Sequence, residues 1–325
     1  MPALIVIPKQ KLARIGLAAL PPLIVNAGES AQWKFLEFFT ANIRNKHTRR
    51  AYSEAVRQFF AWVDQRRLTS LAQLNPVVIA AYIEEIQLTK SKPTVKQHLA
   101  ALRMLFDYLV VGQILPLNPA AAVHGPKFVA RRGKTPVLTP EQARQLLDAI
   151  DTSQLIGLRD RALIGVMVYS FGRISAVTGM KIEDYYQNGK KWWLRLHEKG
   201  GRRHEVPAHH NAEAYLDAYL EAAGLWGDPK AVLFQTVKKG GHLSGKKMAQ
   251  ADAWRMIRRR ALAAGIGVQV GNHTFRATGI TAYLSNKGTL EKAQQIAGHE
   301  SPRTTKLYDR TSDEISLDEI ERILI

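Results

Sequence analysis

Apolar residues recur at helical spacing along most of this 325-residue chain, which restricts the fold to a largely α-helical one. Two segments in the first half, 46–65 and 92–110, show the pattern. The apolar face of the first comprises Tyr52, Val56, Phe59, Phe60 and Val63. The apolar face of the second comprises Val95, Leu99, Leu102, Phe106 and Leu109. Between them, Asn75 and Pro76 supply the N-cap and first-turn residue of another helix. An all-helical domain is therefore expected over residues 32–124.

A stretch rich in glycine, proline and cations, "GPKFVARRGKTP", divides the chain at residues 125–136. Such a composition predicts an exposed linker that can follow a phosphate backbone. Its cations include Arg131, Arg132 and Lys134. Just beyond it, the Thr139 hydroxyl can cap a new helix, with Pro140 at the first position and Gln142 completing a capping box. A second domain is expected to begin here and to span residues 137–311.

The periodicity changes once, in "KWWLRLHEKGGRRHEVP" at residues 191–207. Side chains there alternate with the period of two that is typical of a strand. One set is Trp193, Arg195 and His197, and the opposite set is Trp192, Leu194 and Leu196. Gly200 and Gly201 predict the turn of a β-hairpin, with Lys199 beside it. The expected fold class is thus mainly α, with a small antiparallel sheet inside the second domain.

The chain is strongly basic, with 46 Lys and Arg against 28 Asp and Glu, a net charge of +18. This balance indicates a polyanionic partner, with nucleic acid first and an anionic membrane surface second. A membrane protein needs an apolar span or a basic amphipathic anchor. The only long apolar segment, "LIVIPKQKLARIGLAALPPLIV", is interrupted by prolines and cations. Nucleic acid is therefore the expected partner, without a membrane.

Several kinds of site are excluded by composition. The chain has no cysteine, which excludes disulfides, thiolate zinc sites and cysteine nucleophiles, and fits a reducing, cytoplasmic setting. The segment "HEVPAHH" offers His204, His209 and His210 but lacks a helical His-x-x-x-His pattern. No metal site is expected.

Cations also cluster at two places where they could bind phosphate groups, a helix start and a glycine-rich segment. Lys46, Arg49 and Arg50 stand at the start of a helix, the end where the helix dipole disfavours cations. A phosphate ligand explains this placement, and a solvated basic turn is the alternative. The segment "KKGGHLSGKK" lacks the glycine spacing of a nucleotide-binding loop. It is expected to be a basic loop on DNA through Lys246 and Lys247, or else a solvated lysine loop.

The second domain carries the residue types that transfer a phosphodiester without metal or cofactor. That reaction needs a nucleophile, cations on the non-bridging oxygens and an acid for the leaving oxygen. Arg173 follows an apolar helix, and His273 and Arg276 form "HTFR", a spacing that puts both on one helical face. Arginine suits this work because its fork matches two phosphate oxygens and stays charged. His299 precedes Tyr308 by nine positions in "GHESPRTTKLY".

In the order Arg, hairpin Lys, His-x-x-Arg, Gly-His and Tyr, these residues resemble the tyrosine site-specific recombinases, also called the phage-integrase family. The resemblance spans the second domain, whereas the first is similar to the family's core-binding domain in size and position only. It implies a C-shaped clamp on double-stranded DNA that exchanges strands between two specific recombination sites through a Holliday junction, without metal or ATP. The arm at 1–31 looks too short and apolar for an arm-binding domain, so a simple recombinase is expected.

The resemblance also implies a role for each residue. Tyr308 would attack DNA to leave a 3′-phosphotyrosyl bond and a free 5′-hydroxyl. Contacts to the scissile phosphate would come from Arg173, Arg276 and His299. Lys199 would protonate the departing 5′-oxygen, and His273 would accept or orient the tyrosine proton. Arg202 and Arg203 lie just beyond the same turn, so a shift of register would exchange them with Lys199. Both are also expected to contact DNA.

The sequence departs from the family pattern at one position. The family commonly carries an acidic residue three positions after the first arginine, whereas Ala176 stands there in "RISA". In the family that carboxylate supports the active site from behind the residues that contact the substrate, so its absence bears on the local support of the site and not on the identity of the nucleophile. Glu183 and Asp184 are two candidates to replace it, and the sequence does not decide which acid does so.

The C-terminal segment, 312–325, carries a short apolar stripe. Its members are Leu317, Ile320, Ile323 and Leu324. A helix this short does not persist alone, so it either docks on a neighbouring subunit of a homotetramer or packs on its own domain. Two rival functions remain at this point: a type IB topoisomerase, which rejoins the same strand, and a non-catalytic DNA-binding protein on the same scaffold.

Overall fold

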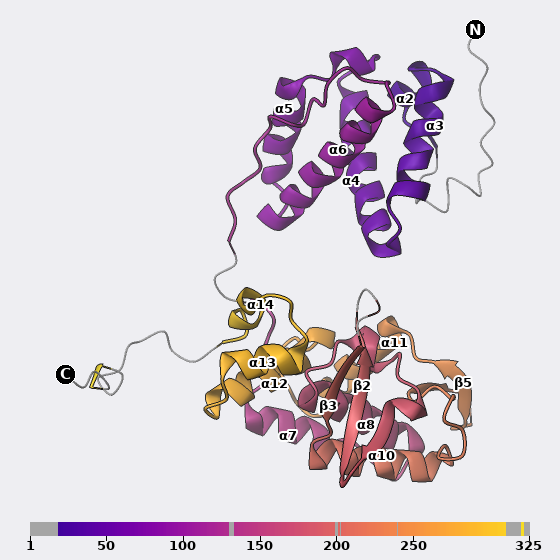
Figure 1. Ribbon diagram of the computed structural model, residues 1–325, viewed down its shortest axis with the longest axis vertical. Coiled ribbons are helices and arrows are strands. Elements are labelled where there is room, and N and C mark those ends of the chain that lie inside the picture. The colour runs from indigo at the N-terminus through magenta and orange to yellow at the C-terminus, as the bar shows by residue number, and fades with distance from the viewer. Residues whose placement is uncertain are drawn as a thin grey trace. The chain divides into compact units, whose positions relative to one another are not determined.

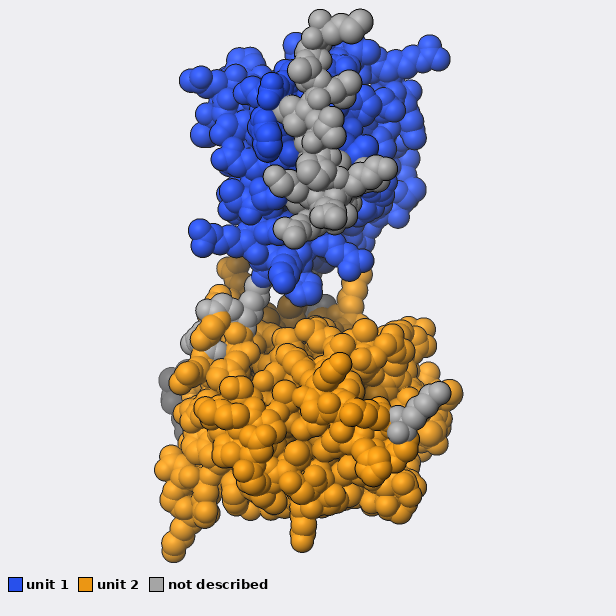
Figure 2. All heavy atoms as spheres, turned by 90° about the vertical axis from the view of Figure 1, so that its right-hand side faces the viewer, with its two compact units in different colours: residues 1–129 blue, residues 130–325 orange. Residues whose placement is uncertain are grey.

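The computed structural model of the chain divides into two compact units, residues 1–129 and 130–325 (Figure 2). The residues that it describes are 19–129, 133–198, 201, 203–238, 240–309 and 320–321. Within these ranges, no helix is long and apolar enough to cross a membrane.

Unit 1 is helical. Its elements are α2 (Pro22–Asn26), α3 (Glu29–Glu37), the π-helical turn η1 (Phe38–Asn42), α4 (Lys46–Gln65), the 3₁₀ turn η2 (Leu71–Gln73), α5 (Pro76–Gln87) and α6 (Lys92–Val111) (Figure 1). The predicted apolar faces of α4 and α6 are confirmed, because their members are buried in one core or packed against it. Phe59 lies at the centre, in edge contact with Tyr82 and Phe106. These edge-to-face pairs join α4, α5 and α6 in one core.

Local capping explains where several helices begin. The Asn75 side chain accepts hydrogen bonds from the backbone N–H groups of Val77 and Val78, as predicted. In unit 2, Thr139 and Gln142 form the expected reciprocal capping box. These bonds satisfy backbone donors that have no partner within the helix.

Unit 2 mixes helices with two small sheets. Its elements are α7 (Pro140–Asp148), α8 (Leu155–Tyr169), α9 (Ile174–Val177), the 3₁₀ turn η3 (Ile182–Asp184), β1 (Tyr185–Asn188), β2 (Lys191–His197), β3 (Arg203–Pro207), α10 (His210–Ala223), β4 (Gln235–Val237), β5 (Leu243–Lys247), α11 (Gln250–Ala263), α12 (Asn272–Ser285), α13 (Leu290–Ala297) and α14 (Pro302–Lys306). Figure 1 shows α12, α13 and α14 gathered at one end of this unit, with β5 at the opposite end.

The main sheet is antiparallel, in the order β1-β2-β3. Leu194 of β2 pairs with Tyr185 on one side and Val206 on the other. Leu194 and Leu196 are fully buried, whereas His197 is exposed, so the predicted alternation is confirmed. The predicted fold class, mainly helical with a small antiparallel sheet, is confirmed as well.

A second sheet corrects one expectation. The prediction of a loop over "KKGGHLSGKK" is wrong for its second half, since β5 pairs antiparallel with β4. Gly240 and Gly241 adopt φ values of +96° and +86°, which allow the chain to reverse direction. The strand lacks apolar alternation and therefore gave no periodic signal. Lys246 and Lys247 are exposed on it.

Candidate active site

Arg276 is the buried centre of a cationic cluster on α12. Its side chain is only 1% exposed, and its two Nη atoms donate to the carbonyl oxygens of Phe171 and Ala297, the latter at 2.6 Å. Gly279 lets α12 approach α8 closely, because a Cβ there would lie 2.1 Å from the Val168 carbonyl oxygen. Burial, and then the charge of Arg173, lower the pKa of Arg276 to about 10. Arg276 is therefore still cationic at neutral pH.

Arg173 stands at the N-cap of α9. Its side chain is 32% exposed and forms an ion pair from Nη1 to Oε2 of Glu198, the residue that follows β2. Glu198 is buried, and no donor within the described ranges reaches its Oε1. Glu198 was not among the predicted site residues, although it continues the inward-facing alternation of Leu194 and Leu196.

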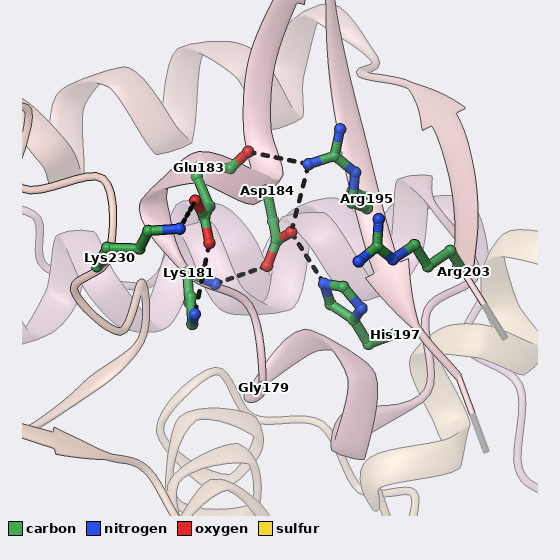
Figure 3. A pocket seen from close by; sticks show the side chains of 8 residues that line it. All are labelled: Gly179, Lys181, Glu183, Asp184, Arg195, His197, Arg203 and Lys230. Carbon is green, nitrogen blue, oxygen red and sulfur yellow. Dashed lines mark hydrogen bonds and ion pairs between the residues drawn. The ribbon is translucent and has the colours of Figure 1, made fainter. Parts of the chain in front are cut away.

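Glu183 and Asp184 do not support Arg173, so that expectation is wrong. Figure 3 shows both around a separate cavity of about 490 Å³. Asp184 is buried and accepts a hydrogen bond from His197 at 2.9 Å, with Arg195 3.9 Å away. Glu183 forms ion pairs with lysines on the rim of that cavity. Asp184 is thus paired with the outer face of the main sheet, and Glu183 is paired with two lysines beside it.

His299 lies between α13 and α14. It follows Gly298, whose φ of +59° ends α13, and is only 7% exposed. Its Nδ1 is 2.8 Å from the Thr305 hydroxyl. Burial, followed by the charges of Arg276 and Arg173, lowers the pKa of His299 to about 3. The imidazole is therefore neutral at pH 7 and has a single N–H to donate.

Tyr308 lies two residues beyond the end of α14 and is not part of that helix. Its backbone is fixed on both sides: its N–H donates to the Thr305 carbonyl at 2.9 Å, and its carbonyl accepts from the Thr281 hydroxyl at 2.8 Å. Its ring is nearly parallel to that of His299, with centroids 5.8 Å apart. The phenol also favours the charged form of Arg276, as expected for a close neighbour.

His273 completes the cluster from the first turn of α12. It is more exposed than Arg276, three residues later. Desolvation, and then the charges of Arg276 and Arg173, lower its pKa from 6.5. The structure thus brings together five of the six candidate catalytic residues: Arg173, His273, Arg276, His299 and Tyr308. Lys199, the sixth, lies outside the described residues.

The candidate DNA-contact residues differ in their exposure and in whether another group of the protein already binds them. Lys46 and Arg50 are exposed at the start of α4. Arg49 instead donates from Nε and Nη2 to the Ile43 carbonyl, at 3.0 and 2.7 Å, and so supports the turn before the helix. Further exposed cations in unit 2 are Lys134, Arg203, Lys246 and Lys247. Three candidates lie outside the described residues: Arg131, Arg132 and Arg202.

The histidines of "HEVPAHH" have other partners. His204 donates from Nε2 to the Ile296 carbonyl at 2.8 Å, and His209 stacks on Tyr169 with centroids 4.1 Å apart. Across the part of the chain that the structure describes, no three or more His, Asp or Glu side chains are grouped to hold a metal ion.

Comparisons with known proteins agree with this geometry. Residues 136–314 match the model of the phage integrase family, and residues 34–112 match that of the phage integrase N-terminal SAM-like domain. A tyrosine recombinase XerC from Thermodesulfovibrio yellowstonii is 27% identical, over 81% of this chain and 85% of its own length. A tyrosine recombinase XerC from Chlamydia muridarum is 31% identical, over 71% of this chain and 70% of its own.

Solved structures show the same fold. The XerH recombinase bound to its difH substrate has a TM-score of 0.67 at 18% identity, covering 94% of this chain and 96% of that chain. A lambda integrase tetramer bound to a Holliday junction has a TM-score of 0.64 at 17% identity, covering 88% and 79%. The prediction of a site-specific DNA recombinase is confirmed, and the topoisomerase and non-catalytic alternatives are not favoured. The chain belongs to the phage integrase family of tyrosine recombinases, enzymes that cleave DNA strands and transfer them to new partners.

Proposed function

We propose that Tyr308 is the nucleophile with which this recombinase cuts DNA. The observation that carries the proposal is the position of its ring, stacked on His299 and beside the buried Arg276. The phenolic oxygen attacks the scissile phosphorus while the bond from phosphorus to the 5′-oxygen breaks. This leaves a 3′-phosphotyrosyl ester and a 5′-hydroxyl. The ester retains the energy of the broken bond, so rejoining requires no nucleotide hydrolysis.

Arg173, Arg276 and His299 are proposed to hold the scissile phosphate. Two guanidinium groups oppose the extra negative charge of the transition state, and one of them, that of Arg276, is buried, where such a donor is most effective. The neutral His299 adds one hydrogen bond. If the Thr305 hydroxyl donates to Nδ1, the ring proton lies on Nε2 and is available to a non-bridging oxygen.

Two proton transfers complete the proposed step. The tyrosine proton passes to His273, whose lowered pKa keeps the imidazole neutral and able to accept it. The departing 5′-oxygen takes a proton from Lys199. In the return reaction both transfers run backwards, and a 5′-hydroxyl from the partner duplex attacks the tyrosyl ester.

The nucleophile is tested with Tyr308→Phe. The target site is first located by mapping covalent cleavage sites across the source genome, and a nicked suicide substrate is built from it. We expect the variant to bind the site with unchanged affinity and to form no covalent adduct. Tyr283→Phe is the matched control, because Tyr283 is a nearby tyrosine of α12 whose ring packs against Phe171. The Tyr283→Phe variant should form the covalent adduct at the wild-type rate. An adduct that persists in Tyr308→Phe would assign the nucleophile to another residue.

Assembly is a further part of the proposal. We propose that the two units bind opposite faces of a duplex, and that four copies join two sites through the C-terminal segment. The supporting observations are the apolar stripe and the matched lambda integrase tetramer. Of the stripe, only Ile320 lies within the described residues, with 51% exposure. Because the matched relatives are bacterial, nucleoid or plasmid DNA in the cytoplasm is the proposed substrate.

Truncation after Thr311 tests the tail. If it docks on a neighbour, half-site binding should persist while the yield of paired sites falls by orders of magnitude, since each buried apolar side chain contributes about 1.5–3 kcal/mol. If it packs on its own domain, the monomer should instead melt at a lower temperature. Unchanged pairing would contradict docking.

A further inference from the structure

Glu198 is a buried carboxylate beside the proposed cleavage site. Its side chain is 5% exposed, against 32% for that of its partner Arg173. Burying a carboxylate is costly unless its oxygens are paired. Here only Oε2 is paired, and Oε1 has no donor among the residues described. The paired oxygen ties Glu198 directly to Arg173, a proposed phosphate contact, so the geometry places this buried carboxylate next to the site.

The register of β2 explains why Glu198 points inward. Side chains alternate along the strand, and Leu194 and Leu196 are fully buried on the inner face. Glu198 is the next residue in this series of alternate positions, so its side chain points to the same inner face as Leu194 and Leu196 and reaches Arg173 at the start of α9. The outer face carries Arg195 and His197, which are paired with Glu205 and Asp184. The sheet thus separates the Arg173–Glu198 pair on its inner side from the ion pairs on its outer face.

The electrostatics of the cluster agree with this placement. Arg173 and Arg276 repel one another, since the charge of Arg173 lowers the pKa of Arg276, and the charge of Glu198 acts in the opposite direction. Before a phosphate arrives, Glu198 is therefore the counter-charge of both guanidinium groups. The fully buried Ala176, on α9 itself, provides no such charge.

We infer that Glu198 is a positioning residue, which holds Arg173 at Nη1 so that the remaining N–H groups of its guanidinium fork face the scissile phosphate. The inference rests on the proposed function, because it takes Arg173 as a phosphate ligand. Glu198 touches neither phosphate nor nucleophile in this scheme and acts only through Arg173. Its loss should therefore reduce the cleavage rate more than the affinity for DNA.

Glu198→Gln is the decisive variant, because it keeps the volume and an acceptor oxygen but removes the charge. Adduct formation on the suicide substrate is measured in single turnover, together with half-site affinity at fixed salt and thermal melting. We expect cleavage to slow by about 10-fold to 100-fold, as for other residues that orient a catalytic group, with affinity changed less than about 3-fold. Glu205→Gln is the matched control: it removes the same charge from β3 of the same sheet and should cleave normally.

A double-mutant cycle separates positioning from general support of the fold. In an Arg173→Lys background the fork is gone, so Glu198→Gln should slow cleavage further by less than about 2-fold. Additive effects of the two changes, or equal losses in affinity and rate, would overturn the inference. A Glu198→Gln variant that cleaves at the wild-type rate would do so as well. Failure of the wild type itself to form an adduct would instead contradict the proposed function.

Discussion

The low pKa of His299 predicts that unit 2 loses stability in mild acid. The folded imidazole titrates near pH 3, whereas an unfolded histidine titrates near 6.5. Between these values the unfolded chain binds a proton that the folded chain does not, so stability falls as the pH drops below 6.5. Going from pH 8 to pH 5 should cost about 2 kcal/mol from His299 alone. For a unit of this size, that corresponds to a melting temperature lower by about 4–8 °C.

The assay is calorimetry of the full chain at pH 8 and pH 5, with wild type and His299→Gln compared at each pH. This difference removes the effect of His98 in unit 1, whose burial lowers its pKa to about 4 and which destabilises that unit in the same range. His299→Gln should lose about 2 kcal/mol less than wild type on acidification. His124→Gln, an exposed substitution, is the control and should follow the wild type. If His299→Gln loses as much stability as the wild type between pH 8 and pH 5, the conclusion that the His299 imidazole is buried and neutral is wrong.

Two further predictions concern the chemistry. Thr305→Val removes the hydroxyl that meets His299 Nδ1, and adduct formation should slow by about 10-fold at unchanged half-site affinity; a wild-type rate would show that the hydroxyl does not orient the ring. Lys199→Ala should be slow on an ordinary phosphodiester but largely restored on a 5′-bridging phosphorothiolate, whose sulfur leaves without an acid. Restoration for variants of Arg202 or Arg203 instead would identify one of those as the acid.

Features governed by neighbours in sequence were predictable. The apolar faces of α4 and α6, the caps at Asn75 and Thr139, and the alternation in β2 all follow from local spacing. β5 was missed because Leu243–Lys247 is polar and contains a glycine, so its pairing with β4 is visible only in three dimensions. Arg49 looked like a phosphate ligand, whereas the turn at Ile43 occupies two of its donors.

Within the site, the chemistry of each residue was readable but the supporting contacts were not. The arginines, histidines and tyrosine were selected from motif order, which fixes neither burial nor partner. Glu183 and Asp184 were the two candidates to replace a carboxylate at Ala176, and the sequence alone did not decide between acids. The structure places Glu198 beside Arg173 instead, at the position that follows β2, a strand that begins 18 residues after Arg173. One signal was present, since Glu198 continues the inward phase of Leu194 and Leu196.

The assignment of Tyr308 is tested most directly by identifying the residue that carries DNA. Wild-type adduct trapped on the suicide substrate is digested with nuclease and trypsin, and the modified peptide is sequenced by mass spectrometry. Cleavage after Lys306 and Arg310 releases Leu-Tyr-Asp-Arg, in which Tyr308 is the only hydroxyl-bearing side chain. The account predicts a nucleotide 3′-phosphate on the tyrosine of this peptide. A nucleotide found on any other peptide, with Leu-Tyr-Asp-Arg recovered unmodified, would contradict it.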